Sequence, residues 1–261
     1  QEVEQRGIDL YVLLDISKSM LAEDVKPNRL DRAKHYISDL LESTHGDRVG
    51  LITFAGVSQI KTPLTIDYRA IRTALEDVRP QSVTQGGSKL GDAIRLAADS
   101  FTDDIQDFKA ILVLSDGEDM DSFPVEAAAS AFQNQGVRVF TVGLGDQAQG
   151  SRIPISMGGN TIYLTYQGEE VWSRMDPNML TQVAMAADGR FYDVGVSNVD
   201  LGEVYKTSLA PTAGRVYQSE RLERAIPRYQ WFVGIGLLLL FIQSFLGERR
   251  SKPSKHAELM A

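Results

Sequence analysis

Three oxygen-bearing side chains stand at alternating positions just after an apolar run near the start of the chain. Asp15, Ser17 and Ser19 form the pattern Asp-x-Ser-x-Ser. One carboxylate and two hydroxyls with this spacing can turn toward one point, and Mg²⁺ prefers such hard oxygen ligands. Because Asp and Ser are also common in turns and helix caps, a metal site needs further ligands from elsewhere in the chain.

Two further oxygen ligands are expected from segments far along the chain. Ser88 precedes a helical pattern, and Asp116 follows a buried apolar run. Ligands of open α/β sheets bind outside the carboxyl ends of the strands, where such residues meet. We therefore predict one site for Mg²⁺ or Mn²⁺, with five ligands: Asp15, Ser17, Ser19, Ser88 and Asp116. A rim that contacts a partner is expected to contain four charged residues: Lys18, Glu23, Asp24 and Glu118.

The elements that must position these residues alternate between apolar strand-like runs and amphipathic helical runs. Strands are expected at residues 10–14, 49–54, 58–61, 110–114, 137–144 and 190–192. Helices are expected at residues 30–41, 68–78, 90–101, 124–135, 177–187 and 198–208. This alternation predicts an α/β fold with a doubly wound, mostly parallel sheet, and the segment 58–61 is expected at its edge.

The alternation breaks after Gly145. Residues 152–155 and 161–165 flank a Gly-Gly-Asn turn, which is typical of a β-hairpin. We therefore predict a hairpin insertion over about residues 147–175 within a domain of residues 1–210. The following segment, 211–228, could be either a strand packed on the domain or a linker that approaches a membrane.

Residues 229–246 form a run of eighteen residues without a charged side chain. As a helix this run would extend about 27 Å, close to the roughly 30 Å of a bilayer's hydrocarbon core. Aromatic residues at its start and a basic tail, 247–261, suit the two interfaces. We predict a C-terminal transmembrane helix, for which a buried core helix is the alternative. Basic residues lie on both sides, so the charges do not fix the orientation.

Composition excludes several classes of function. The 261 residues are 43% hydrophobic, which is enough for one sizeable core, and they carry a net charge of −8. With no basic stripe to neutralise phosphates, nucleic-acid binding is not expected. The chain contains no cysteine, which excludes disulfides and thiolate chemistry. The three histidines are scattered, and His35 is expected at the surface of its helix.

Five segments carry a family resemblance: DISKSMLAEDVKPNRLDRAK, GDRVGLITFAG, PLTIDYRA, GGSKLGDAI and LVLSDGEDM. They resemble the membrane-anchored von Willebrand factor A (VWA) proteins of the BatA/BatB aerotolerance type. The resemblance implies a Rossmann-like VWA fold and a metal-ion-dependent adhesion site, whose ligands match Asp15, Ser17, Ser19 and Asp116. Ser88 stands where the family usually has threonine. Family members usually carry transmembrane helices before the domain, so we expect that such an anchor was removed or belongs to a segment before Gln1.

Asp15 and Asp116 are the two carboxylates of the ligand set, and if one of them acts through water, a bound Mg²⁺ keeps net positive character and an exchangeable position. An Asp or Glu of another protein could then complete its coordination, so the expected function is metal-dependent protein binding. The resemblance implies that related proteins work with other Bat-type proteins and a MoxR-type AAA+ ATPase in envelope stress tolerance and complex assembly. It also implies a location in the bacterial inner membrane, with the domain in the periplasm and the tail in the cytoplasm.

A Mg²⁺-dependent phosphotransferase is the alternative function. Enzymes of the haloacid-dehalogenase kind also place an Asp after the first strand, but they need a second carboxylate two residues later, where this chain has Ser17. Because this second carboxylate is missing, we expect no enzymatic activity.

The acidic run at 116–121 is not expected to bind calcium, because it lacks the glycine and the final glutamate of a calcium-binding loop.

Overall fold

The computed structural model describes residues 5–44, 46–80, 87–101, 109–157, 160–195, 200–209, 215–217, 238–240 and 242. The chain divides into two units, Gln1–Tyr217 and Gln218–Ala261. In the second unit the described residues are helical and exposed: Leu238, Leu239, Leu240 and Ile242. Across the described residues we find no helix with the length and apolar character needed to cross a membrane. Most of the predicted span at 229–246 lies outside the described residues.

A six-stranded sheet forms the centre of the first unit. In spatial order its strands are β13 (Phe191–Gly195), β6 (Arg138–Leu144), β5 (Lys109–Ser115), β2 (Asp9–Asp15), β3 (Arg48–Phe54) and β4 (Ser58–Thr65). The five strands from β13 to β3 are parallel, and β4 pairs antiparallel with β3 at the edge. The predicted mostly parallel sheet and its edge strand are confirmed, although β4 extends four residues beyond the predicted end.

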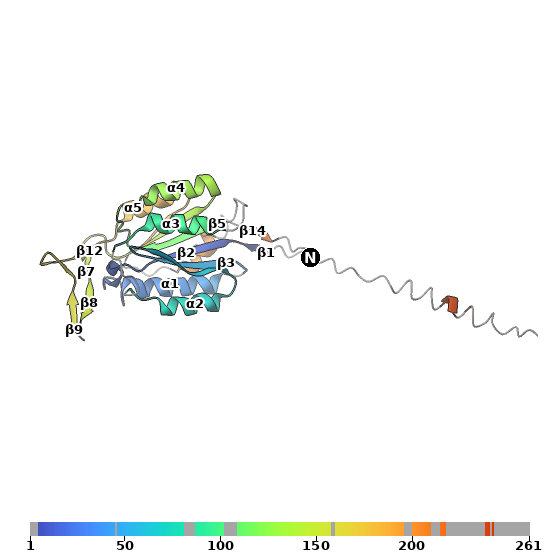
Figure 1. Ribbon diagram of the computed structural model, residues 1–261, viewed down its shortest axis with the longest axis horizontal. Helices are drawn as coiled ribbons and strands as arrows, with labels where there is room; N and C mark the ends of the chain where they lie inside the picture. The colour runs from blue at the N-terminus through green and yellow to red at the C-terminus, as the bar shows by residue number, and fades with distance from the viewer. Residues whose placement is uncertain are drawn as a thin grey trace, which may run out of the picture. The chain divides into compact units, whose positions relative to one another are not determined.

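Helices cover both faces of this sheet. They are α1 (Arg29–Ser43), α2 (Tyr68–Asp77), α3 (Leu90–Asp99), α4 (Pro124–Gln135), α5 (Pro177–Ala186) and α6 (Leu201–Val204). Figure 1 shows α1 and α2 on one side of the sheet and α3, α4 and α5 on the other. The predicted helix at 198–208 is instead the short α6 followed by a π-helical turn, η3 (Tyr205–Leu209).

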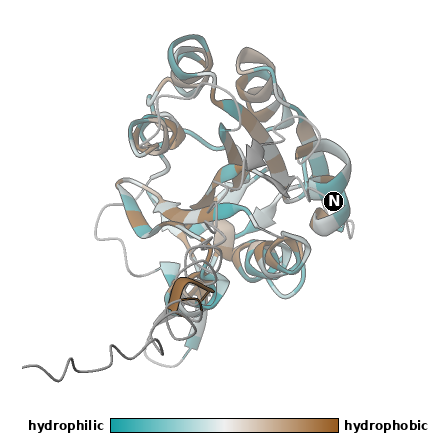
Figure 2. Cartoon of the chain, turned by 90° about the vertical axis from the view of Figure 1, so that its right-hand side faces the viewer, coloured by the Kyte–Doolittle hydropathy of each residue, from teal (hydrophilic) through white to brown (hydrophobic). Residues whose placement is uncertain are grey.

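The core consists of two apolar layers, one on each face of the sheet. Alternate residues of β2 point to opposite layers, because successive side chains of a strand point to opposite faces. Leu10, Val12 and Leu14 pack in the layer under α1, whereas Tyr11 and Leu13 pack in the layer under α3 and α4. Figure 2 shows the strands enclosed between the helices. Burial on both faces explains why β2 is apolar along almost its whole length.

An arm of three antiparallel strand pairs connects β6 to α5. It contains β7 (Ser151–Arg152) with β12 (Trp172–Ser173), β8 (Pro154–Met157) with β9 (Asn160–Tyr163), and β10 (Thr165–Tyr166) with β11 (Glu169–Glu170). The predicted hairpin corresponds to β8 and β9. In Figure 1 the arm lies at the opposite end of the unit from β1 (Gln5–Gly7) and β14 (Arg215–Tyr217), which pair with each other. In the segment 211–228, residues 215–217 are described, and they form a strand, which was one of the two predicted alternatives.

Candidate functional site

The five predicted ligands meet at the carboxyl edge of the sheet, beside the arm. Asp15 is the last residue of β2, and Asp116 follows the last residue of β5. The two strands are parallel neighbours with Leu14 opposite Leu114, so their ends bring both carboxylates to one place. In the sheet, β2 lies between β3 on one side and β5 on the other, so the strand order reverses at β2. Ligands of doubly wound sheets bind at such a switch point.

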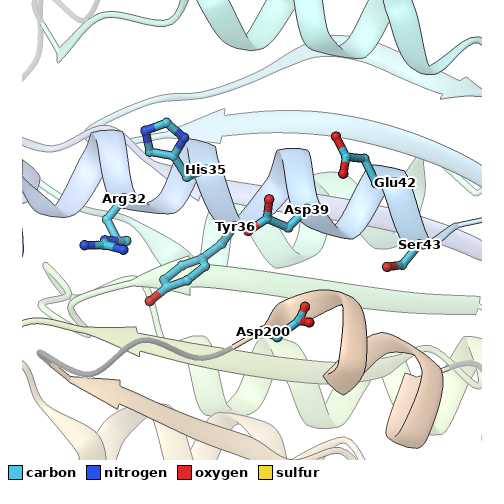
Figure 3. A pocket seen from close by; sticks show the side chains of 7 residues that line it. All are labelled: Arg32, His35, Tyr36, Asp39, Glu42, Ser43 and Asp200. Carbon is cyan, nitrogen blue, oxygen red and sulfur yellow. The ribbon is translucent and has the colours of Figure 1, made fainter.

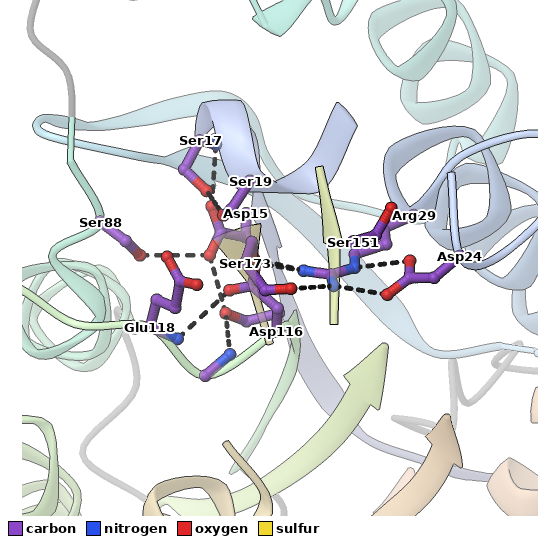
Figure 4. A network of polar contacts seen from close by, with 12 residues as sticks. Asp15, Ser17, Ser19, Asp24, Arg29, Ser88, Asp116, Glu118, Ser151 and Ser173 are labelled. Atoms are coloured by element: carbon purple, nitrogen blue, oxygen red, sulfur yellow. Dashed lines mark hydrogen bonds and ion pairs between the residues drawn. The ribbon is translucent and has the colours of Figure 1, made fainter. Parts of the chain in front are cut away.

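The carboxylate of Asp15 lies at the centre of this cluster and is fully buried. One of its oxygens accepts a hydrogen bond from the amide of Ser17 at 2.8 Å. The other accepts hydrogen bonds from the hydroxyls of Ser115 at 2.7 Å and Ser88 at 3.1 Å (Figure 4). Burial, followed by the nearby charge of Asp116, raises the pKa of Asp15 to about 7. A positive charge beside Asp15 would offset the cost of keeping it ionised.

The hydroxyls of Ser17 and Ser19 lie side by side, with their oxygens 2.8 Å apart. Both residues are buried, at the start of the 3₁₀ turn η1 (Lys18–Leu21). The amide of Ile16 donates to the carbonyl of Phe54 at 2.8 Å, so the pairing of β2 with β3 continues one residue past the strand. This bond fixes the direction in which the chain enters the turn, and both hydroxyls face the same point.

Ser88 is held at the site by the loops around it. Its carbonyl accepts a hydrogen bond from the amide of Met120 at 2.8 Å. The amide of the next residue, Lys89, donates to the carbonyl of Ala55 at 2.8 Å. The first turn of α3 packs closely on the loop after β5, since a side chain on Gly91 would come within 2.0 Å of the Ser122 carbonyl. The backbone therefore positions Ser88 beside Asp15.

Asp116 is paired with a buried arginine, Arg29, which is not among the predicted site residues. A guanidinium nitrogen of Arg29 lies 2.9 Å from one carboxylate oxygen of Asp116, and both side chains are fully buried. The other carboxylate oxygen accepts the amide of Glu118 at 3.2 Å. Arg29 also donates to both oxygens of Asp24, at 2.9 and 2.6 Å, and to the hydroxyl of Ser173 at 2.7 Å. Burial alone would lower the pKa of Arg29, but these carboxylates raise it.

The predicted rim residues lie in three different places. Lys18 and Glu118 are exposed and line the same cavity as Ser17, Ser19 and Ser88. Glu23 is exposed but lines a smaller hollow of about 170 Å³ beside Arg152 and Trp172. Asp24 is engaged in the ion pair with Arg29, and its side chain is only 7% exposed. The structure thus adds Arg29, Ser115 and Ser173 to the neighbourhood of the site.

The donor set consists of oxygen atoms. The five side chains offer three hydroxyls and two carboxylates, and hard cations prefer oxygen ligands of this kind. In the part of the chain that the structure describes, no three His, Cys, Asp or Glu side chains form a group that could hold a metal ion. Any metal bound here would therefore depend on the serine hydroxyls.

A second cavity runs along the outer face of α1. It has a volume of about 660 Å³, and Figure 3 shows His35, Asp39 and Glu42 on successive turns of the helix. These three side chains are exposed, as expected for His35, and they form a solvated helix face.

A doubly wound sheet with an oxygen-rich cluster at its carboxyl edge is the arrangement of a VWA domain. A family model for the von Willebrand factor type A domain matches residues 10–118, which include all five predicted ligands. BatB from Bacteroides thetaiotaomicron is 32% identical, with a TM-score of 0.73 over 79% of this chain and 98% of that one. An aerotolerance-related membrane protein from Bacteroides fragilis is 33% identical, with a TM-score of 0.69 over 77% of this chain and 96% of that one.

The chain therefore belongs to the VWA domain family, in its group of Bat-type, aerotolerance-related proteins. Proteins with VWA domains are typically interaction modules rather than enzymes. An uncharacterised protein of Borreliella burgdorferi is 29% identical over 192 residues, which cover 72% of this chain and 54% of that protein. The chain thus spans about half the length of this curated relative.

Proposed function

We propose that the chain binds a protein partner through a divalent cation, Mg²⁺ or Mn²⁺, held by Asp15, Ser17, Ser19, Ser88 and Asp116. The observation that carries this proposal is the convergence of oxygen side chains from three distant loops around the buried carboxylate of Asp15. When bound, the cation would supply a hard electrophilic centre for a carboxylate oxygen of the partner. The partner would thus contribute an Asp or Glu side chain.

The ion pair with Arg29 supports a site of this kind. One oxygen of Asp116 is already held by Arg29, and the other accepts an amide hydrogen. This leaves Asp116 a weak donor that is best suited to act through a water molecule. Of the two ligand carboxylates, Asp15 has amide and hydroxyl partners but no cationic one among the described residues. Less negative charge at the site favours an additional carboxylate from outside.

We propose further that the domain does not act as an enzyme. Ser17 occupies the place where a phosphotransferase needs its second acid, and its hydroxyl contacts Ser19 instead of a base. The phosphotransferase alternative therefore lacks its proton-transfer group.

The anchoring and the cellular partners are proposed from the sequence and the family. The uncharged run at 229–246 and the basic tail at 247–261 support a C-terminal membrane anchor, and the relative from Bacteroides fragilis is described as a membrane protein. We propose a VWA domain over residues 1–210 and a juxtamembrane segment over 211–228, whose strand β14 pairs with β1 of the domain. We also propose a location in the bacterial inner membrane with the domain in the periplasm. Other Bat-type proteins and a MoxR-type AAA+ ATPase are the proposed partners.

Calorimetric titration of the full chain with Mn²⁺ tests the metal site. The wild type should bind one ion, Asp15→Ala should bind none, and Ser19→Ala, which removes a single hydroxyl, should bind more weakly. Asp188→Ala is the control, because Asp188 is exposed and pairs with Arg138 outside the cluster. Circular dichroism would establish that each variant is folded. Unchanged Mn²⁺ binding by a folded Asp15→Ala variant would refute the assignment.

A pull-down from membranes with Mg²⁺ or with a chelator tests the partner. Proteins retained by the wild type with Mg²⁺, and lost with chelator or with Asp15→Ala, would be candidates. Equal capture under all of these conditions would contradict metal-dependent binding.

A further inference from the structure

The cavity beside the five ligands extends away from them along the arm. It has a volume of about 980 Å³, at the upper end of the range of about 300–1,000 Å³ for ligand pockets. Ser17, Ser19 and Ser88 line one part of it, and residues of the arm and of α5 line another. The cavity is therefore a groove that begins at the proposed metal site.

One wall of the groove is an apolar patch on the arm, formed by Ile153, Leu164 and Val171. The amide of Leu164 donates to the carbonyl of Ile153 at 2.9 Å, and the amide of Val171 donates to the carbonyl of Leu164 at 2.8 Å. The three residues are thus held side by side by backbone hydrogen bonds. Ile153 is buried, and the other two are half-buried, so their side chains can still take part in binding.

Two methionines, Met120 in the loop after β5 and Met179 in α5, also line the groove. Met120 is 60% exposed and packs over Gly87, where an added side chain would come within 2.4 Å of its sulfur. Methionine side chains are flexible and polarizable, and they adapt to apolar groups of different shape. The groove therefore combines a fixed apolar wall with an adaptable one.

Charges at the rim indicate where an acidic group would lie. Lys18 is exposed at the end of the groove that contains the serines, and its ammonium group attracts a carboxylate. Glu118 lines the same groove and repels a second acidic residue. Asp119, which also lines it, is occupied as an acceptor for the amides of Leu90 and Ser122.

From these observations we infer that the groove binds an extended peptide segment in which the metal-binding Asp or Glu is followed closely by a large apolar residue. This inference rests on the proposed function, since the acid would bind at the metal site. The apolar side chain would lie between Leu164 and Met179. The arm would therefore determine which acidic segments bind, and the metal site would supply a contact that any exposed acid could make.

Selection of a phage library of random peptides with a fixed central Asp, on the full chain with Mg²⁺, tests this inference. Selected peptides should carry Leu, Ile, Met or Phe within a few positions of the Asp. For such a peptide, Leu164→Asn should raise the Kd at least about tenfold, because a buried apolar contact is lost. Ile162→Asn is the matched control, because Ile162 is an exposed arm residue that is not among those lining the groove. Met179→Asn probes the part of the groove formed by α5 without altering the arm.

The outcomes separate this inference from the proposed function. Selection of Asp peptides that require Mg²⁺ but show no apolar preference would overturn the inference and leave the proposed function standing. Peptides that bind equally well with chelator would overturn both. If Leu164→Asn and Met179→Asn keep wild-type Mn²⁺ binding and bind the peptides as well as Ile162→Asn does, the groove is not the binding surface.

Discussion

Replacing Arg29 by methionine should strongly destabilise the domain. The substitution keeps a long apolar side chain but removes the guanidinium group, which donates hydrogen bonds to Asp24, Asp116 and Ser173. Asp116 is fully buried, so it would be left as a buried carboxylate without a cationic partner. Breaking a buried ion pair in this way costs about 3–5 kcal/mol of unfolding free energy.

This loss corresponds to a lower melting temperature. For a domain of this size, 1 kcal/mol shifts the Tm by about 2–4 °C, so Arg29→Met should lower it by about 6–20 °C. Arg72→Met is the matched control, because Arg72 pairs with Glu42 at 3.7 Å and the two side chains are 41% and 68% exposed. Its expected effect is below about 1 kcal/mol.

Thermal unfolding followed by circular dichroism, with and without Mg²⁺, would measure both effects. With Arg29 removed, a divalent cation at the site would supply a positive charge close to Asp116 in its place. Mg²⁺ should therefore raise the Tm of Arg29→Met by more than it raises that of the wild type. A Tm loss no larger than that of Arg72→Met would refute the structural role assigned to the ion pair. An equal Mg²⁺ effect on both proteins would refute the electrostatic link between Arg29 and the site.

Four further predictions concern packing, acid stability, catalysis and anchoring. Gly91→Ala should cost about 1–3 kcal/mol and weaken Mn²⁺ binding, because its methyl group would collide with the Ser122 carbonyl and displace the segment that carries Ser88; melting curves and Mn²⁺ titration would measure this. Burial alone would raise the pKa of Asp24, but hydrogen bonds from Arg29 and the Asp146 amide lower it below its ordinary value of 3.8. Its contribution to stability is therefore present above that value and is lost as the pH falls through the lowered one, so Asp24→Asn should reduce the Tm at neutral pH and flatten the loss of Tm in acid. Purified protein with Mg²⁺ should not hydrolyse phosphate esters or ATP, and activity that disappears in Asp15→Ala would instead favour the phosphotransferase alternative. Protease added to spheroplasts should digest the VWA domain and spare a tag placed after the last residue; loss of the tag with a protected domain would reverse the proposed orientation.

The sequence by itself determined the class of the fold and the positions of most elements. Local periodicity is sufficient for this, because a strand buried on both faces is apolar throughout and an amphipathic helix repeats with a period near 3.6 residues. The helix that begins at Pro124 and ends at Gln135 has the predicted bounds, since proline favours a helix start and Gly136 adopts the left-handed conformation that ends it. Elements with weak local patterns, such as α6 and β4, were predicted less accurately.

The sequence also indicated which oxygen side chains could meet, because the ends of parallel strands share one edge of the sheet. It did not reveal that Arg29 pairs with Asp116, which lies 87 residues away, or that Ser173, 144 residues away, contacts Arg29. The local pattern gives neither Arg29 nor Ser173 a role at the site, since an arginine in the first turn of a helix and a serine in a short strand are ordinary at the surface.

Only the tertiary structure decided the environment of the candidate site. The return of the arm toward the carboxyl edge buries Arg29 against two carboxylates and places Leu164 along the same groove as Ser17 and Ser88. Both results depend on how distant segments pack, which no periodicity within one segment encodes. The ligand types were thus readable from the chain, whereas their charge balance and the shape of the groove arise from contacts between segments far apart in the sequence.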